Sequence, residues 1–253
     1  MLQTVRELIK SSRLLNFNQL DRDCWVRRQA ERLPPGSRVL DVGAGSGPYR
    51  DAFAHCEYRS QDFTQLQPNQ LRHGGYGAID YVCDATAIPV ADASFDAVLC
   101  TEMLEHVPEP IPVVRELARI LRPGGVLILT APLGSGIHQE PFHFYGGYTP
   151  YWYQRFLPEA GFDRIQIEPN AGSFRFFGQE SIRFAYSTRP FALRMPFPME
   201  VLWTPVWLLL VPVLGLLVPL VCAVIDRFDR ESRFTVGYHV TAQRAAEANR
   251  AEP

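Results

Sequence analysis

The chain is poor in lysine, and its cysteines are neither paired nor clustered. Of its 25 lysine and arginine residues only Lys10 is a lysine, and the formal net charge is −2. No run of basic residues could follow a phosphate backbone, so the sequence predicts no nucleic-acid partner. The 5 cysteines form no CxxC pair, so neither a zinc site nor a redox pair is indicated, and we expect reduced core thiols.

The N-terminus lacks the long apolar core of a secretory signal. Residues 1–17, MLQTVRELIKSSRLLNF, are amphipathic instead, so we expect the catalytic part in the cytoplasm. Charge is missing from one long stretch near the C-terminus, VLWTPVWLLLVPVLGLLVPLVCAVI (201–225). A soluble protein rarely needs a helix that is apolar on every face, and this stretch therefore predicts membrane contact in preference to burial.

Short apolar runs alternate with amphipathic segments along the rest of the chain, which is typical of an α/β sheet with parallel strands. The expected helices cover 1–33, 48–55, 110–121 and 149–162. The expected strands are 38–43, 57–63, 81–85, 94–103, 126–132, 164–170 and a last one within 233–244. We interpret 1–33 as a helical cap, 34–170 with 233–245 as the catalytic domain, and 171–232 as an insertion.

A glycine-rich turn stands between the first strand and the next helix. In VLDVGAGSGPY (39–49), Gly43, Gly45 and Gly47 permit positive φ angles and close approach of a ligand to the backbone. The spacing is GxGxG, whereas dinucleotide oxidoreductases, the rival enzyme class, use GxGxxG. Asp62 and Asp84 end the next two strands, where a carboxylate can bind ribose hydroxyls or an adenine amino group.

Four blocks in order then resemble one family. VLDVGAGSG, the acids that follow it, FDAVLCTEMLEHVPEP and LARILRPGGVLILTAP resemble class I S-adenosylmethionine-dependent methyltransferases over Arg38–Pro132. The resemblance implies a doubly wound, seven-stranded Rossmann-like sheet with an antiparallel last strand, and S-adenosylmethionine as cofactor. The hydrophobic insertion would then lie between strands six and seven.

The resemblance also implies roles for individual residues. Asp41 with Gly43, Ala44, Gly45 and Gly47 would hold the methionine part of the cofactor. Asp62 would bind the ribose, and Asp84 with Ala85 would frame the adenine. Thr101 and Glu102 would lie beside the sulfonium.

Candidate catalytic groups follow the fourth and fifth strands. A hydroxyl acceptor must lose a proton, which requires a general base or a metal ion. His106, with Glu105, is the first candidate base, and Glu102, Glu105 and His106 together are a possible divalent-cation site of the kind that the resemblance to ubiquinone-pathway O-methyltransferases implies. His143, in a loop that should cover the acceptor, is the second candidate base. The alternative interpretations are that Glu105 and His106 only hold their loop together and that His143 belongs to a packed aromatic lid.

The topology limits how the apolar stretch can meet a membrane. If the strands on either side of the insertion pair in one sheet, both ends of the insertion lie on the same side of a bilayer. Pro205, Pro212, Gly215 and Pro219 then favour a bend inside 201–225 and a re-entrant hairpin, supported by an interfacial helix around 178–195. The alternative is a single span, for which 25 residues would extend roughly 37 Å.

The sequence therefore predicts a membrane-associated methyltransferase at the cytoplasmic face of the inner membrane. We expect O-methylation of a lipid-linked or amphiphilic molecule: a glycolipid, a polyprenyl-linked sugar or a quinone precursor. The alternative function is a catalytically silent protein that binds S-adenosylmethionine or acts as a scaffold.

Overall fold

The computed structural model describes residue 12 and residues 14–246. Most of the part of the predicted helix 1–33 that precedes Phe17 lies outside these residues. The chain divides into two compact units. The sheet unit contains Arg22–Glu168 and Gly237–Pro253, and the hairpin unit contains Met1–Asp21 and Pro169–Val236.

The sheet unit is built on seven strands in the order β3-β2-β1-β4-β5-β7-β6. β7 runs antiparallel to β5, with Gly237 opposite Pro132, whereas the β1, β2, β3, β4 and β5 pairings are parallel. This topology confirms the predicted fold class. The strands are β1 (Arg38–Val42), β2 (Glu57–Asp62), β3 (Tyr81–Val82), β4 (Phe95–Thr101), β5 (Leu121–Pro132), β6 (Phe162–Pro169) and β7 (Gly237–Arg244).

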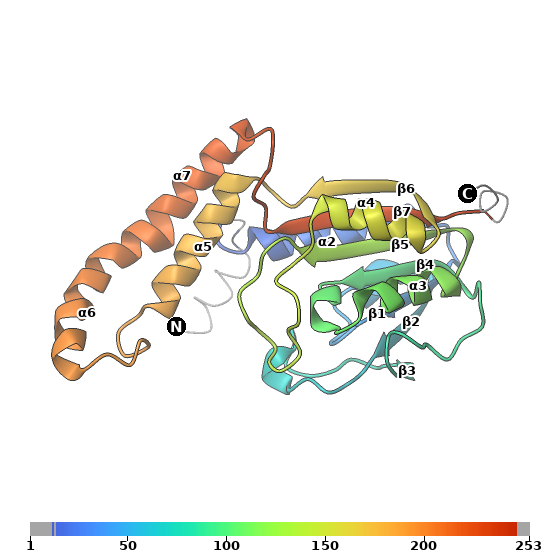
Figure 1. Cartoon of the computed structure of the whole chain (residues 1–253), viewed down its shortest axis with the longest axis horizontal. Coiled ribbons are helices and arrows are strands. Elements are labelled where there is room, and N and C mark those ends of the chain that lie inside the picture. Colours follow the sequence, from blue (N-terminus) through green and yellow to red (C-terminus); the bar gives the residue numbers. More distant parts are fainter. Residues whose placement is uncertain (1–11, 13, 247–253) are drawn as a thin grey trace. The chain divides into compact units, whose positions relative to one another are not determined.

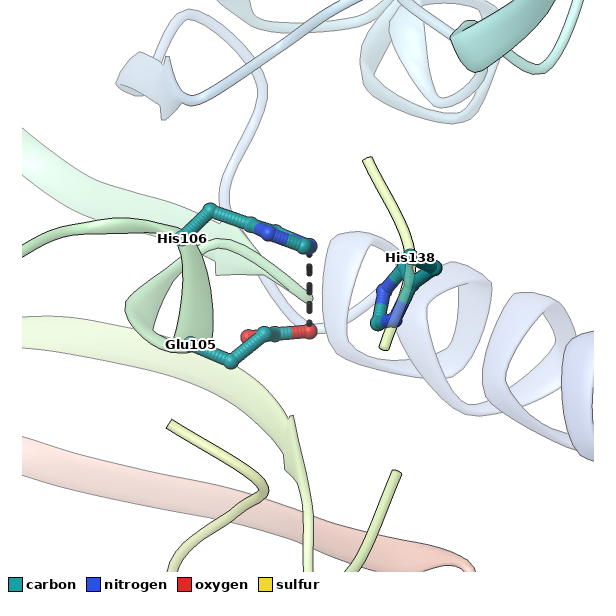
Figure 2. Close-up of side chains that lie close together, drawn as sticks. All are labelled: Glu105, His106 and His138. Atoms are coloured by element: carbon teal, nitrogen blue, oxygen red, sulfur yellow. Dashed lines mark ion pairs between the residues drawn. The ribbon is translucent and has the colours of Figure 1, made fainter. Parts of the chain in front are cut away.

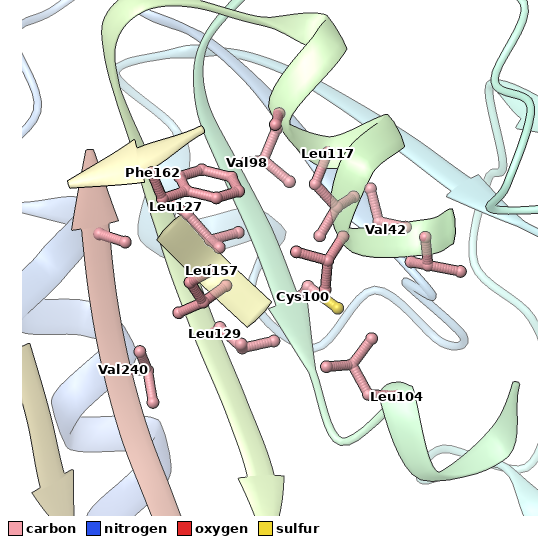
Figure 3. Close-up of a cluster of buried hydrophobic side chains, with 14 of the residues drawn as sticks. Val42, Val98, Cys100, Leu104, Leu117, Leu127, Leu129, Leu157, Phe162 and Val240 are labelled. Atoms are coloured by element: carbon pink, nitrogen blue, oxygen red, sulfur yellow. The ribbon is translucent and has the colours of Figure 1, made fainter. Parts of the chain in front are cut away.

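Helices cover the sheet because its central strands are apolar on both faces. Along β4, Val98 and Cys100 point to one core and Ala97 and Leu99 to the other, as the two-residue period of a strand requires. Helices α3 (Pro110–Ile120) and α4 (Pro150–Glu159) pack on the first core through side chains such as Leu117 and Leu157 (Figure 3). Trp25, Val26 and Ala30 of α2 (Phe17–Ala30) complete the second core.

Two local predictions were wrong. The segment expected to be a helix over 48–55 is a single 3-10 turn, Arg50–Phe53. The strand expected over 126–132 begins earlier, since β5 starts at Leu121 and shifts its register against β4 between Phe95 and Ala97. Gly124, at a φ of +76°, absorbs the irregularity.

The hairpin unit is helical between β6 and β7. Its helix α5 (Ser173–Ser187) is followed by α6 (Phe197–Pro212), the π-helical segment η4 (Val213–Leu217), α7 (Val218–Ile225) and η5 (Asp226–Phe228). The segments from α6 to η5 form one continuous helix, Phe197–Phe228. It runs antiparallel to α5, beside which it packs (Figure 1).

The bend predicted inside 201–225 is therefore absent, and the chain reverses at 188–196 instead. Pro219 has no N–H to offer the helix, and the helix accommodates it by a π segment in which Val218 donates to Val213. The hydroxyl of Ser181 on α5 donates to the carbonyl of Leu214 at 2.8 Å. In a π-helix this carbonyl would accept from the N–H of residue 219, which Pro219 lacks. A proline in a helix thus need not produce a turn.

Candidate functional site at the carboxyl edge of the sheet

The glycine turn has the conformation that the sequence predicted. Gly43, Gly45 and Gly47 follow β1 with φ angles of +72°, +53° and +65°. A Cβ on Gly43 would lie 2.4 Å from Cγ of Met103, so glycine is required there for packing as well. The turn is fixed to β2, because the amides of Gly43 and Ala44 both donate to the carbonyl of Gln61 at 3.0 Å.

Asp41 lies buried at the end of β1, directly before this turn. The hydroxyl of Tyr58 donates to its Oδ2 at 2.5 Å, while its Oδ1 has no hydrogen-bond partner among the described residues. Burial raises the pKa of Asp41 to about 7, although the Tyr58 hydrogen bond acts in the opposite direction. A buried carboxylate oxygen without a partner is costly, and a ligand with a positively charged donor would satisfy it.

The two acids after β2 and β3 occupy different environments. Asp62 is buried, and its Oδ2 and Oδ1 accept hydrogen bonds from the amides of Gly45 and Thr64, both at 2.9 Å. It therefore holds the glycine turn, and the remaining lone pairs of its oxygens are those available to a ligand. Asp84 is exposed and accepts from the amide and the hydroxyl of Thr86 through Oδ1, with Ala85 buried beside it.

Glu102, at the end of β4, is held by partners that sequence reasoning did not identify. Its Oε2 forms an ion pair with Arg22 of α2 at 3.0 Å, and its Oε1 accepts from the hydroxyl of Thr130 at 2.9 Å. Burial of Arg22 disfavours its charge, but Glu102, Tyr49 and Asp23 together outweigh that effect and raise the pKa of the guanidinium. Thr101 lies one residue earlier, opposite Thr130 in the register of β4 and β5. A cofactor-side position for Glu102 is compatible with these contacts.

Glu105 and His106 form the buried side of a second cluster. Nδ1 of His106 lies 2.6 Å from the carbonyl of Phe142, so this nitrogen carries the proton and Nε2 is left as the basic atom. Nε2 lies 3.7 Å from Oε1 of Glu105, as the dashed line in Figure 2 marks. Burial lowers the pKa of His106 to about 4, and His138 and His143 act in the same direction.

The carboxyl of Glu105 is almost fully buried. Burial raises its pKa well above the ordinary range, and the negative charge of Glu102 raises it further. Its Oε2 is a buried oxygen for which the described residues provide no hydrogen-bond partner.

The loop after β5 brings two further imidazoles to this cluster. The ring of His138 lies 4.8 Å from that of His106 and 4.7 Å from that of His143, centroid to centroid. Ligand atoms of Glu105, His106 and His138 lie within 4.8 Å of one another (Figure 2). His138 was not among the predicted site residues, although its position five residues before His143 in HQEPFH was a usable signal.

Residues 40–129 match a family model described as a methyltransferase domain. The chain therefore carries a methyltransferase domain over these residues. This methyltransferase domain includes the glycine turn, all three strand-end acids and the segment with Glu105 and His106.

Similar proteins agree with this family. An uncharacterized methyltransferase of Mycobacterium sp. (strain JLS) is 37% identical over 134 residues, which are 49% of this chain and 52% of the relative. A ubiquinone biosynthesis O-methyltransferase of Xanthomonas campestris pv. campestris (strain B100) is 38% identical over 104 residues, 38% of this chain and 43% of the relative. The chain thus spans about half the length, or less, of these curated relatives.

A solved structure extends the likeness beyond the family match, as a likeness of fold. The phosphoethanolamine N-methyltransferase 2 of Haemonchus contortus, in complex with phosphomonomethylethanolamine and S-adenosylhomocysteine, superposes with a TM-score of 0.52 at 17% identity. The match covers 90% of this chain and 53% of that one. At this identity the shared feature is the methyltransferase fold, and the acceptor has to be argued from the site.

Proposed function

We propose that this domain binds S-adenosylmethionine at the carboxyl edge of its sheet and transfers the methyl group to an oxygen of an amphiphilic acceptor. The observation that carries the proposal is the buried Oδ1 of Asp41, which has no hydrogen-bond partner among the residues that the structure describes and lies beside the positive-φ glycine turn. This oxygen fits the ammonium group of the methionine part of the cofactor. The H. contortus enzyme, whose fold this domain shares, is described in complex with the demethylated form of the same cofactor.

Each predicted cofactor residue would then contact one moiety of the cofactor. Ala44, Gly45 and Gly47 would offer backbone to the methionine moiety. Asp62 would accept from the ribose, and Asp84 with Ala85 would frame the adenine. Thr101 and Glu102 would border the sulfonium, whose methyl group is electrophilic when the cofactor is bound, so the protein supplies alignment and electrostatics.

His106 is our candidate for the base that accepts the acceptor's hydroxyl proton. Its Nδ1–H is fixed on the Phe142 carbonyl, which orients the neutral Nε2 for proton uptake. His143 is the second candidate, since its Nε2 lies 3.1 Å from the hydroxyl of Ser135 and is less buried. Glu105 would assist as the neighbour of Nε2.

For a divalent cation, the predicted set needs revision. Both oxygens of Glu102 already have partners, whereas Glu105, His106 and His138 present their ligand atoms together. The unpartnered Oε2 of Glu105 and two imidazoles fit an ion that accepts mixed oxygen and nitrogen ligands. These three residues would hold such an ion, which would acidify a bound hydroxyl.

We propose an acceptor that is lipid-linked or amphiphilic: a glycolipid, a polyprenyl-linked sugar or a quinone precursor at the cytoplasmic face of the inner membrane. Two observations support this class. Among the described residues, one helix, Phe197–Phe228, is long and apolar enough to cross a bilayer, and only 11% of its most apolar window is buried. In addition, one relative is a ubiquinone biosynthesis O-methyltransferase.

The decisive test is the transfer of label from methyl-labelled S-adenosylmethionine to extracted membranes of the source organism. We expect label in a lipid-soluble fraction when the intact chain is added, and none with the Gly45→Val variant. Label confined to protein or nucleic acid would refute the acceptor class, and binding of cofactor without any transfer would favour the catalytically silent alternative.

Replacing His106 with glutamine should lower kcat by about 100-fold while the dissociation constant for S-adenosylhomocysteine stays unchanged, because a positioned base contributes about that much. The His55→Gln variant, at an exposed histidine, is the matched control. Since the pKa of His106 is about 4, its imidazole stays neutral down to that pH, and wild-type kcat should not fall between pH 8 and pH 6. A larger loss in His143→Gln than in His106→Gln would reassign the base.

A further inference from the structure

The hairpin unit exposes an apolar surface that is wider than the stripe that one partner helix would cover. Neighbouring residues are exposed in pairs along α6 and η4, and successive residues of a helix point about 100° apart. A partner helix would cover a narrow stripe, leaving one member of each pair in water. The pairs are Val201 with Leu202, Leu208 with Leu209, and Leu216 with Leu217.

The two helices also form hydrogen bonds with each other. The indole N–H groups of Trp203 and Trp207 donate to the carbonyls of Thr188 and Ala185, which belong to the C-terminal turn of α5, at 2.7 and 2.8 Å. Gly178 permits close packing, because a Cβ there would lie 3.2 Å from Cβ of Cys222. Small residues at the contact and internally satisfied carbonyls are what a helix pair in a lipid environment requires.

The charges on α5 decide how such a pair meets lipid. Glu180 and Arg183 form an ion pair at 3.2 Å on a half-exposed face of α5. In a hairpin standing across a bilayer these charges would lie in the hydrocarbon, which is unfavourable. Arg189 and Arg194, both exposed at the turn between the helices, would moreover have to cross to the far side.

We propose that the hairpin unit lies in the plane of a single leaflet of an anionic membrane. In this arrangement α6, η4 and α7 are immersed at the level of the upper acyl chains, and α5 faces the headgroups. Arg189 and Arg194 contact lipid phosphates at the turn. This inference rests on the proposed function. It adds that the amphiphilic acceptor reaches the enzyme from the lipid monolayer in which the hairpin unit lies.

Depth measurements on the full chain test the orientation. A bimane label would be placed on four exposed positions that follow one side of the helix, and quenched by lipids carrying bromine at defined acyl depths in vesicles of phosphatidylglycerol and phosphatidylethanolamine. Cys24, Cys56 and Cys83 would first be replaced by serine. The four variants are Leu202→Cys, Leu209→Cys, Leu216→Cys and Val224→Cys.

An in-plane helix gives four similar, shallow depths. A profile that is deepest at Leu209 and Leu216 and shallow at both ends would show a transverse hairpin and overturn the proposal. Bimane labels that stay in water when these vesicles are present would overturn the proposal as well. The proposal would also be wrong if the labels became shielded from water without lipid, because the chain then self-associates through this surface.

Charge changes provide the second measurement. Leu209→Lys and Leu216→Lys should each weaken vesicle binding at least tenfold, whereas Ala54→Lys, an equal charge on an exposed residue of the sheet unit, should not. Arg189→Gln and Arg194→Gln should each reduce affinity for the anionic vesicles about fivefold. Calorimetry should show unchanged binding of S-adenosylhomocysteine in all these variants. This measurement tests the methyltransferase assignment separately from membrane binding.

Discussion

Replacing Asp41 with asparagine is expected to weaken the binding of S-adenosylhomocysteine by about 100-fold at pH 8. The variant keeps the size of the side chain but removes the negative charge that Oδ1 offers to the ligand's ammonium group. A hydrogen bond between charged groups contributes up to about 3 kcal/mol, which corresponds to that factor. Isothermal titration calorimetry measures the dissociation constant. The control is Asp96→Asn, which lies at the beginning of β4 and therefore at the opposite edge of the sheet.

The same residue predicts a pH dependence. Because burial raises the pKa of Asp41 to about 7, the carboxyl becomes neutral below that pH and no longer attracts the ammonium group. The wild-type dissociation constant should therefore increase as pH falls from 8 to 6, by up to tenfold per unit below 7. The asparagine variant should show no such dependence, and KM for the cofactor should change while kcat does not. A wild-type dissociation constant that is flat over this range would contradict the role of Asp41.

Replacing Gly43 with alanine is expected to lower the free energy of unfolding by about 3 kcal/mol. The φ of +72° is unfavourable for alanine, and the new Cβ would lie 2.4 Å from Cγ and 2.9 Å from Cβ of Met103. Since Cβ of Met103 is fixed to the backbone, a rotamer change cannot relieve the second contact. The glycine turn would have to move, and cofactor binding should be lost together with stability. Urea denaturation measures the first effect and calorimetry the second.

Gly36 is the matched control for this change. Its φ is +78°, and a Cβ there would meet nothing within 4 Å, so alanine should cost only the backbone strain of roughly 1 kcal/mol. Equal losses at Gly36 and Gly43 would show that steric overlap with Met103 is unimportant. The difference between the two variants is the part that depends on packing at the site.

The parts of the site that the sequence predicted are those determined by local order along the chain. Gly43 follows an apolar strand, Asp62 ends the next strand, and Asp84 lies two residues beyond β3, so parallel pairing alone brings them to one edge. The ion pair of Arg22 with Glu102 could not be found in this way, because the two residues are 80 positions apart and belong to a helix and a strand end that meet only in the folded sheet. His138 is a different case, because HQEPFH was a usable signal for it, although a loop without periodicity does not fix the direction of its side chains.

The bend predicted inside 201–225 failed for a different reason. Proline was interpreted by its local effect on an isolated helix, but Ser181, on another helix, donates to the carbonyl of Leu214 next to the disturbance. At the site, two hydrogen bonds of Asp62 go to the backbone that shapes the turn, and the sequence did not predict them. In both places a polar group, the Leu214 carbonyl or the Asp62 carboxylate, is bonded to a residue distant in sequence, and the sequence alone does not indicate that partner.

Helix α2 has a practical consequence for dissecting the chain. The boundary between the two units falls at Asp21 and Arg22, in the middle of this helix. On the hairpin side Asp21 forms an ion pair with Arg175, and on the sheet side Arg22 and Asp23 pair with Glu102 and Arg72. Cutting there would leave a helical fragment of about two turns on the sheet side, too short to be stable by itself. A truncated sheet unit should therefore begin before Phe17, so that it keeps the whole helix.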